Sequence, residues 1–113
     1  MSYDEGLAER VREKLGSKTE VSEKKMFGGL CFMVSGHMCC GILGDTLMAR
    51  VGPEQYKECL GNPHASEMDF TGRPMKGLVY VSAEGVSEDG DLSQWIDRCL
   101  DFVASLPEKN AES

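Results

Sequence analysis

Residues 24–52 read KKMFGGLCFMVSGHMCCGILGDTLMARVG, and this stretch decides the fold. Short runs with a β-type composition are separated by two dipeptides, Ser35-Gly36 and Gly44-Asp45, that are typical of tight two-residue turns. Strands are therefore expected in the runs beside these turns, at 30–34, 38–43 and 46–51. Consecutive strands joined by tight turns form an antiparallel meander.

Helical patterns surround the meander. An apolar stripe of Leu7, Val11 and Leu15 predicts a first helix that ends near Gly16, with Ser2 and Glu5 as a capping box. A short helix is expected at 53–61, and a last one from a cap at Asp91 to about residue 106. One further strand is predicted at 78–82, and residues 62–76 and 84–90 are interpreted as loops.

Strands and helices are thus segregated along the chain, which favours an α+β fold. The prediction is an antiparallel β-sheet, made of the meander plus a further strand, packed with N-terminal, middle and C-terminal helices. The length of 113 residues and the 41% apolar content suit one globular domain over 1–106. Residues 107–113 follow a proline and are expected to form a flexible C-terminal tail.

Charge and cysteine content limit the classes of function. The chain carries 12 Lys and Arg against 19 Asp and Glu, a net charge of -7, which disfavours direct binding of nucleic acid. Neither a signal peptide nor an apolar run long enough for a membrane span is visible, so the protein is expected to be cytoplasmic. Its five cysteines are then expected to stay reduced.

The two turns predict which strand residues share a face of the sheet. Side chains alternate along a strand, and Cys31 is expected opposite Cys40, with Phe32 opposite Cys39. A wholly apolar face, expected to form the core, then comprises Cys31, Met33, Met38, Cys40, Ile42, Leu47, Ala49 and Val51. A mixed face, expected to be only partly covered, comprises Leu30, Phe32, Val34, His37, Cys39, Leu43, Thr46, Met48 and Arg50.

This register bears directly on the chemistry of the cysteines. Cys39 and Cys40 are expected on opposite faces, and the chain has no Cys-x-x-Cys motif, so no metal site is predicted. Cys31 and Cys40 are interpreted as small buried hydrophobic residues, close enough for a disulfide only at suitable Cα spacing. Cys39 is the candidate reactive thiol, because a neighbouring Arg50 would lower its pKa.

The loop DFTGRPMK, residues 69–76, projects two cations, Arg73 and Lys76. Together with Arg50 they are a candidate site for an anion or a partner. The alternative is a loop held by an ion pair between Arg73 and Asp69. No set of residues typical of a catalytic site is recognisable, and no cofactor is predicted.

Three segments carry a resemblance to a known family: KMFGG, LMARVG and FTGRPMKG, in this order. They resemble the TfoX N-terminal domain family, found in two-domain TfoX/Sxy regulators of DNA-uptake competence. The resemblance implies an α+β domain without established catalytic residues, here expected to stand alone without the C-terminal helical domain. The matching positions are Met26, Phe27, Gly28, Gly29, Arg50, Gly72, Arg73, Pro74, Met75 and Lys76.

Three functions are compatible with these observations. The favoured one is a small non-enzymatic regulatory module that binds another protein, with Phe27, Gly28 and Gly29 added to the candidate contact residues. The second is a thiol-based redox sensor or enzyme that uses Cys39. The third is a nucleic-acid binder that acts through Arg50, Arg73 and Lys76. A homodimer formed through an exposed sheet edge is also considered.

Overall fold

A computed structural model of the chain describes residues 3–26, 28–67 and 77–106. It contains one six-stranded sheet in the order β1-β2-β3-β4-β6-β5, in which every neighbouring pair is antiparallel. The strands are β1 (Ser22–Met26), β2 (Gly29–Val34), β3 (His37–Leu43), β4 (Thr46–Arg50), β5 (Ala65–Glu67) and β6 (Leu78–Val81). The helices are α1 (Glu5–Gly16), α2 (Tyr56–Leu60) and α3 (Asp89–Ala104), with a 3-10 turn η1 (Ala83–Val86) before α3. The predicted α+β class is confirmed.

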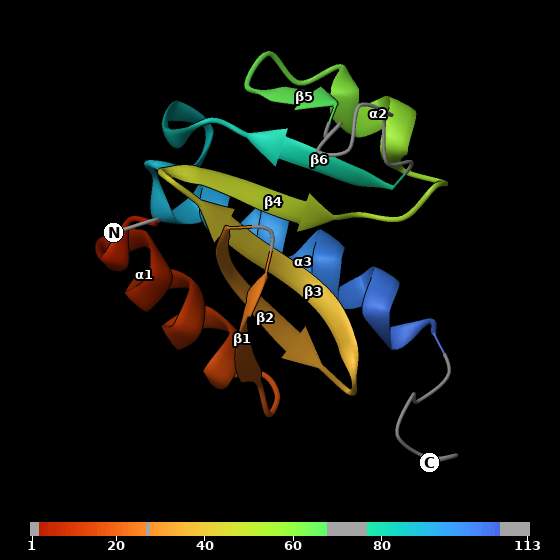
Figure 1. The fold of residues 1–113 in the computed structure, drawn as a ribbon. Coiled ribbons are helices and arrows are strands. Elements are labelled where there is room, and N and C mark those ends of the chain that lie inside the picture. The colour runs from red at the N-terminus through yellow and green to blue at the C-terminus, as the bar shows by residue number, and fades with distance from the viewer. Residues whose placement is uncertain (1–2, 27, 68–76, 107–113) are drawn as a thin grey trace.

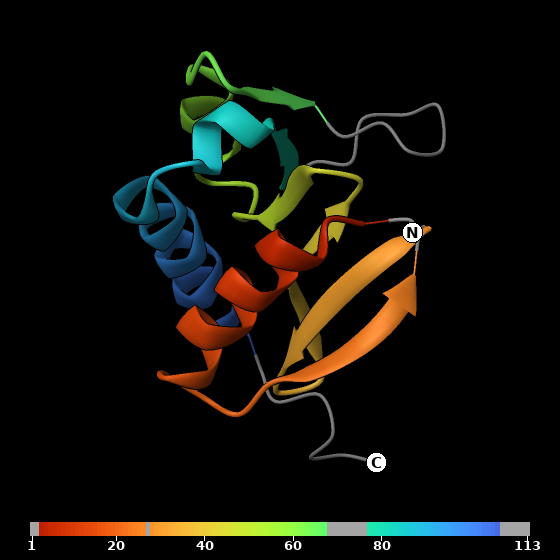
Figure 2. The same ribbon diagram turned by 90° about the vertical axis from the view of Figure 1, so that its left-hand side faces the viewer.

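The helices lie against one face of the sheet (Figures 1 and 2). Figure 2 shows α1 and α3 next to each other on that face, and the two helices are in contact. The α1 stripe of Leu7, Val11 and Leu15 is buried there, as predicted. The apolar stripe of α3, from Leu92 to Val103, is buried against β3 and β4. Burial of these stripes provides most of the free energy that holds the helices to the sheet.

The helix starts differ from the sequence prediction. The side chain of Asp4 caps α1 by accepting from the backbone N–H groups of Gly6 and Leu7, at 2.9 and 3.3 Å. Ser2, the predicted cap, lies outside the described residues. Helix α3 starts two residues before Asp91, with Glu88 at the N-cap position. Asp91 is therefore a first-turn residue, where a carboxylate still interacts favourably with the helix dipole.

Both predicted turns are present. Ser35 and Gly36 have φ angles of 54° and 82°, and Val34 pairs with His37 across them. Two consecutive positive φ values are those of a type I′ turn, which matches the twist of a hairpin. Leu43 pairs with Thr46 across the second turn.

The register between the turns is nevertheless not the predicted one. Met33 pairs with Met38, but Phe32 pairs with Cys40, so Cys39 is an extra residue in β3. One extra residue is a β-bulge, and it reverses the alternation of side chains beyond it. The predicted pairs Phe32–Cys39 and Cys31–Cys40 are wrong for this reason, and Cys31 instead pairs with Gly41.

The bulge changes which face of the sheet is the core. The main hydrophobic cluster takes Leu30, Phe32 and Val34 from β2, all of which were predicted on the mixed face. Cys31 and Met38, predicted in the core, belong to a second cluster with Met48, and Met33 packs against it. The β4 residues Leu47 and Ala49 lie in the main cluster, as predicted. The bulge thus makes Phe32, which is fully buried, one of the largest core side chains.

The edge strand β1 is attached to α1 by an ion pair. The Arg12 guanidinium on α1 donates two hydrogen bonds to the Glu23 carboxylate, one of them at 3.0 Å between Nη2 and Oε1. Hydrogen bonding from Arg12 lowers the pKa of Glu23, although partial burial opposes the shift. Because the folded-state pKa is lowered, the pair stabilises the fold above the ordinary Glu pKa of about 4.3 and loses its effect as the pH falls through the folded value.

We expect Glu23→Gln to lower the free energy of unfolding at neutral pH by about 0.2–1 kcal/mol, the range for exposed pairs. At a pH below both pKa values the difference from wild type should vanish, because Glu23 is then protonated in both states. Urea denaturation at the two pH values measures this, and Glu20→Gln is the matched control, since no ion pair among the described residues involves Glu20. A deficit of the same size at both pH values would contradict the assignment.

Candidate functional site

Three buried thiols meet beneath α3. Cys39 and Cys40 are consecutive residues of β3, and Cys99 lies on α3. All three are 0% exposed and belong to the main core cluster. Cys40 and Cys99 are near enough to Cys39 to influence the pKa of its thiol. The expectation that Cys39 and Cys40 lie on opposite faces is therefore wrong, and the bulge at Cys39 is the reason.

This arrangement shifts the pKa values of the three thiols in different directions. Hydrogen bonds from Cys40 and Cys99 lower the pKa of Cys39, the charge of Arg50 adds to the effect, and burial opposes it. The donors change in the other direction: hydrogen bonding to Cys39 and burial raise the pKa values of Cys40 and Cys99. The cluster can therefore stabilise one thiolate, at Cys39.

Arg50 is held firmly in place beside this cluster. Its Nη1 donates to the carbonyl oxygen of Met38 at 3.2 Å, and its guanidinium carbon lies 5.3 Å from the centroid of the Phe102 ring. The backbone of Arg50 also acts on Cys99, where it partly offsets the upward shift of that thiol's pKa. Arg50 is thus a half-buried residue that joins β3, β4 and α3. The other two candidate cations, Arg73 and Lys76, lie outside the described residues, as does Phe27.

Gly28 and Gly29 have backbone roles in the structure. Gly28 has a φ of 77°, a conformation that favours glycine. Gly29 begins β2 so close to β3 that an added Cβ would lie 2.0 Å from the carbonyl oxygen of Ile42. A side chain at position 29 would therefore separate the two strands. The two glycines fit a structural explanation of the KMFGG segment.

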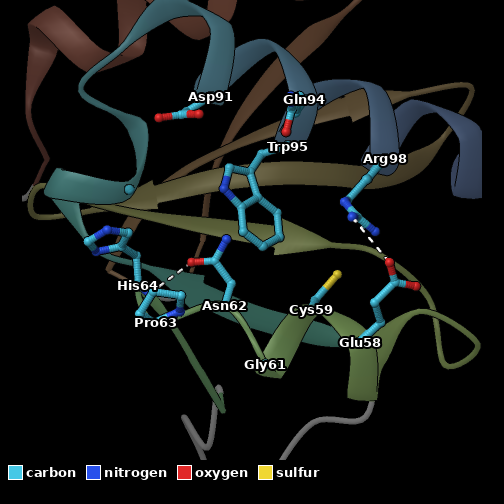
Figure 3. Close-up of a pocket in the computed structure, with 11 residues that line it drawn as sticks. Glu58, Cys59, Gly61, Asn62, Pro63, His64, Asp91, Gln94, Trp95 and Arg98 are labelled. Atoms are coloured by element: carbon cyan, nitrogen blue, oxygen red, sulfur yellow. Dashed lines mark hydrogen bonds and ion pairs between the residues drawn. The ribbon is translucent and has the colours of Figure 1, made fainter.

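A separate pocket of about 420 Å³ opens between α2, the following loop and the first half of α3 (Figure 3). Trp95 forms its inner wall and is 6% exposed. The lining is otherwise mostly polar, and it includes Glu58, Asn62, His64, Asp91, Gln94 and Arg98. The close approach of η1 to the loop depends on Gly85, where an added Cβ would lie 2.6 Å from the His64 Cβ. Two segments far apart in sequence thus form one polar cavity.

Arg98 closes one side of this pocket and connects α3 to α2. Its Nη1 donates to the Gln55 Oε1, and its Nη2 lies 3.6 Å from the Glu58 Oε2. Its guanidinium carbon lies 5.9 Å from the Trp95 ring centroid. On the opposite side, Asn62 Oδ1 accepts a hydrogen bond of 2.8 Å from the backbone N–H of His64, which fixes the loop. Hydrogen bonds and an ion pair within the domain therefore hold the residues that line the pocket in place.

Within residues 3–26, 28–67 and 77–106, no group of three or more His, Cys, Asp and Glu side chains is arranged to hold a metal ion. The same described ranges contain no helix that combines the length and apolar character needed to cross a bilayer. The described side chains offer hydrogen bonding and charge in the pocket and, in the core, a Cys39 thiol whose pKa is lowered.

Comparison with known proteins defines the family. The sequence matches the TfoX N-terminal domain family over residues 13–103. The chain belongs to that family. The resemblance carried by the KMFGG, LMARVG and FTGRPMKG segments is thereby confirmed, and the matched range of this TfoX N-terminal domain runs from α1 into α3. No curated protein and no solved structure matches the chain.

Sequence reasoning about this TfoX N-terminal domain found Cys39 and Arg50 but missed the Trp95 pocket. Trp95 was recognised only as part of the apolar stripe of the last helix, and His64 only as a loop residue. The missed signal is compositional: Trp95 is the only tryptophan of the chain and has charged neighbours one turn away on the same helix, at Asp91 and Arg98. Side chains spaced by three or four residues share one face of a helix.

Proposed function

We propose that this TfoX N-terminal domain is a non-enzymatic regulatory module that acts by binding another protein. Membership of the TfoX N-terminal domain family supports a role of the competence-regulator type. The observation that carries the proposal is an acidic surface over η1 and α3. Six exposed carboxylates and one arginine lie between residues 84 and 101; the carboxylates are Glu84, Glu88, Asp89, Asp91, Asp97 and Asp101.

Two of these carboxylates are neutralised within the domain and four are not. Asp89 lies 3.1 Å from Arg10, and Asp97 lies 3.4 Å from Lys18. Among the described residues, none of the other four takes part in an ion pair. A surface with this uncompensated charge repels phosphate backbones and attracts basic protein surfaces, and it raises the association rate with them. The partner is accordingly a protein with a basic contact region.

A site-specific photo-crosslinker tests this proposal in the cell of origin. Gln94 is exposed on the acidic surface beside the pocket, and Glu13 is exposed on α1. With p-benzoylphenylalanine at position 94, we expect covalent capture of a distinct second protein. The same residue at position 13 is the matched control and should capture it weakly or not at all. Adducts that contain only copies of the domain, or identical adducts from both positions, would contradict the proposal.

A second candidate function, thiol-based redox sensing by Cys39, is favoured by one observation. The pKa of Cys39 is lowered, chiefly by hydrogen bonding to the Cys40 and Cys99 thiols, with a smaller contribution from the charge of Arg50. The thiolate is the reactive form of cysteine, so Cys39 meets the electronic requirement. Its complete burial limits the oxidants that could reach it to small ones.

The native protein should therefore show the ultraviolet absorbance of a thiolate at neutral pH, where an ordinary cysteine is mostly protonated. Because the pKa of Cys39 is lowered, this absorbance should disappear only when the pH falls through the folded-state value. We expect Cys39→Ser to remove the signal. Cys59→Ser should keep it, because burial raises the pKa of Cys59 and leaves that thiol protonated. Its absence from the wild-type protein would exclude this second function.

A further inference from the structure

The indole N–H of Trp95 is a hydrogen-bond donor that faces into the pocket. Figure 3 shows the nitrogen on the side of the ring toward Asp91 and His64, away from Arg98. Trp95 as a whole is 6% exposed, its N–H is not one of the fully enclosed polar atoms that lack a partner, and no hydrogen bond joins it to a described residue. A tryptophan side chain can only donate, so a group that satisfies this N–H from within the pocket must be an acceptor. A peptide carbonyl oxygen is such a group.

The charge available to a ligand in this pocket is negative. Arg98, its only described cation, is already engaged by Gln55 and Glu58. Asp91 is exposed at the rim and takes part in no ion pair with a described residue. Glu58 retains most of its exposure, at 72%, despite its contact with Arg98. The rim therefore offers one unpaired carboxylate and one that is only partly neutralised.

The neutral polar groups of the lining add acceptors beside these carboxylates. Gln94 and Asn62 each carry an amide oxygen, and the Asn62 oxygen already accepts from the His64 backbone. A carbonyl oxygen has two lone pairs, so a second hydrogen bond remains possible there. Among protein side chains, arginine has the most donors, five in a planar fork, and its fork matches a carboxylate.

We propose that the pocket binds an arginine side chain of the protein partner, with the guanidinium at Asp91 and a neighbouring peptide carbonyl at the indole N–H of Trp95. This inference rests on the proposed function, because the arginine belongs to the bound protein. It specifies where on the domain the partner binds and which of its side chains is recognised. Lysine fits less well, since its ammonium group has three donors and cannot form a bidentate contact.

Calorimetry with short peptides tests the site directly. The probes are acetyl-Gly-Arg-Gly-amide, its lysine analogue, and the analogue with citrulline, a neutral residue of nearly the same shape as arginine. We expect saturable binding of the arginine peptide, weaker binding of the lysine peptide and none of the citrulline peptide at the same concentrations. Equal binding of the arginine and citrulline peptides, or preferential binding of the glutamate analogue or inorganic phosphate, would overturn the proposal.

Matched variants on one helix locate the binding. Asp91→Asn removes the rim charge and should weaken the arginine peptide roughly tenfold, the scale of one charge-assisted hydrogen bond. Asp101→Asn removes another exposed carboxylate of α3 that forms no ion pair with a described residue and lies outside the pocket lining, and should leave the affinity within about twofold of wild type. Both positions are exposed, so both variants should fold. Equal loss in the two variants would show that only the general charge of the surface matters, and would overturn the assigned site.

The two proposals can fail separately. In one outcome, the crosslinker at position 94 captures a partner whose binding survives Asp91→Asn, and the TfoX N-terminal domain binds no arginine peptide. This outcome would leave the protein-binding function standing and remove this site. Arginine peptide binding without any captured protein would keep the pocket chemistry and contradict the partner.

Discussion

Replacing Phe32 with alanine is expected to lower the free energy of unfolding by about 3–5 kcal/mol. Phe32 is fully buried in the main core cluster, where the bulge at Cys39 directs it toward the helices. Removal of the ring eliminates its apolar contacts and leaves a cavity that the surrounding β-sheet can fill only in part. Since domains of this size are stable by about 5–15 kcal/mol, the loss should be a large fraction of the total. Urea denaturation monitored by circular dichroism measures it.

Met33→Ala is the matched control for the register. Met33 is the next residue on β2, is only half-buried and packs against the second, smaller cluster. We expect it to cost about 1 kcal/mol, because large losses need a fully buried side chain. If the unbulged register held, Met33 would be in the core and the order of the two losses would be reversed. A larger loss for Met33→Ala than for Phe32→Ala would therefore contradict the bulge.

Gly29→Ala is the second substitution with a large expected effect. The new methyl group would lie 2.0 Å from the Ile42 carbonyl oxygen and 3.2 Å from the Leu43 Cα. These are backbone atoms of β3, so no side-chain rotation relieves the contact, and the two strands must move apart. Overpacking usually costs about 1–3 kcal/mol, and we expect this case to reach about 3 kcal/mol or more.

Gly16→Ala separates this steric effect from the general effect of losing a glycine. Gly16 is the last residue of α1, and an added Cβ there would have no atom within 4 Å. We expect the melting temperature to stay the same or rise, because alanine stabilises a helix by up to about 1 kcal/mol relative to glycine. Comparable losses at positions 16 and 29 would mean that the close approach of β2 and β3 is not the reason for glycine at position 29.

The two turns could be predicted from the sequence, but the pairing register of β2 and β3 could not. Ser35-Gly36 and Gly44-Asp45 have compositions that specify tight turns, and both were located correctly. The bulge is the placement of one extra residue, Cys39, in β3. Cys39 and Cys40 are residue types that ordinary strands also contain, so the sequence does not mark the position of the bulge. Since one residue changes the face of every side chain beyond it, this local feature reversed the faces of β2.

Of the two edge strands, β5 was missed, and β1 was expected only as a short strand from Lys25 to the turn at Phe27, Gly28 and Gly29. The β1 sequence SEKKM is polar and charged and shows no alternation of apolar residues. An edge strand contributes little to the core, and charges on it hinder pairing with a second sheet. β5 has only three residues, within a segment rich in turn formers. Homodimerisation through such an edge stays a prediction.

The candidate sites were predictable to different degrees. The neighbourhood of Cys39 and Arg50 could be predicted because it lies within one meander, although the role of Cys99 required the packing of α3 on the sheet. The pocket brings a loop that follows α2 together with the first half of α3, and only the tertiary structure brings these segments together. Its residues therefore had no shared motif by which they could be found.

The indole resonance of Trp95 in a proton–nitrogen correlation spectrum tests the central claim most directly, because the chain has one tryptophan and the spectrum one such signal. During titration with acetyl-Gly-Arg-Gly-amide, we predict that this signal shifts progressively to a plateau, together with the side-chain amides of Asn62 and Gln94. The citrulline peptide should leave these signals in place. A stationary indole signal, while amides of other elements shift, would contradict the binding of a basic partner at this pocket.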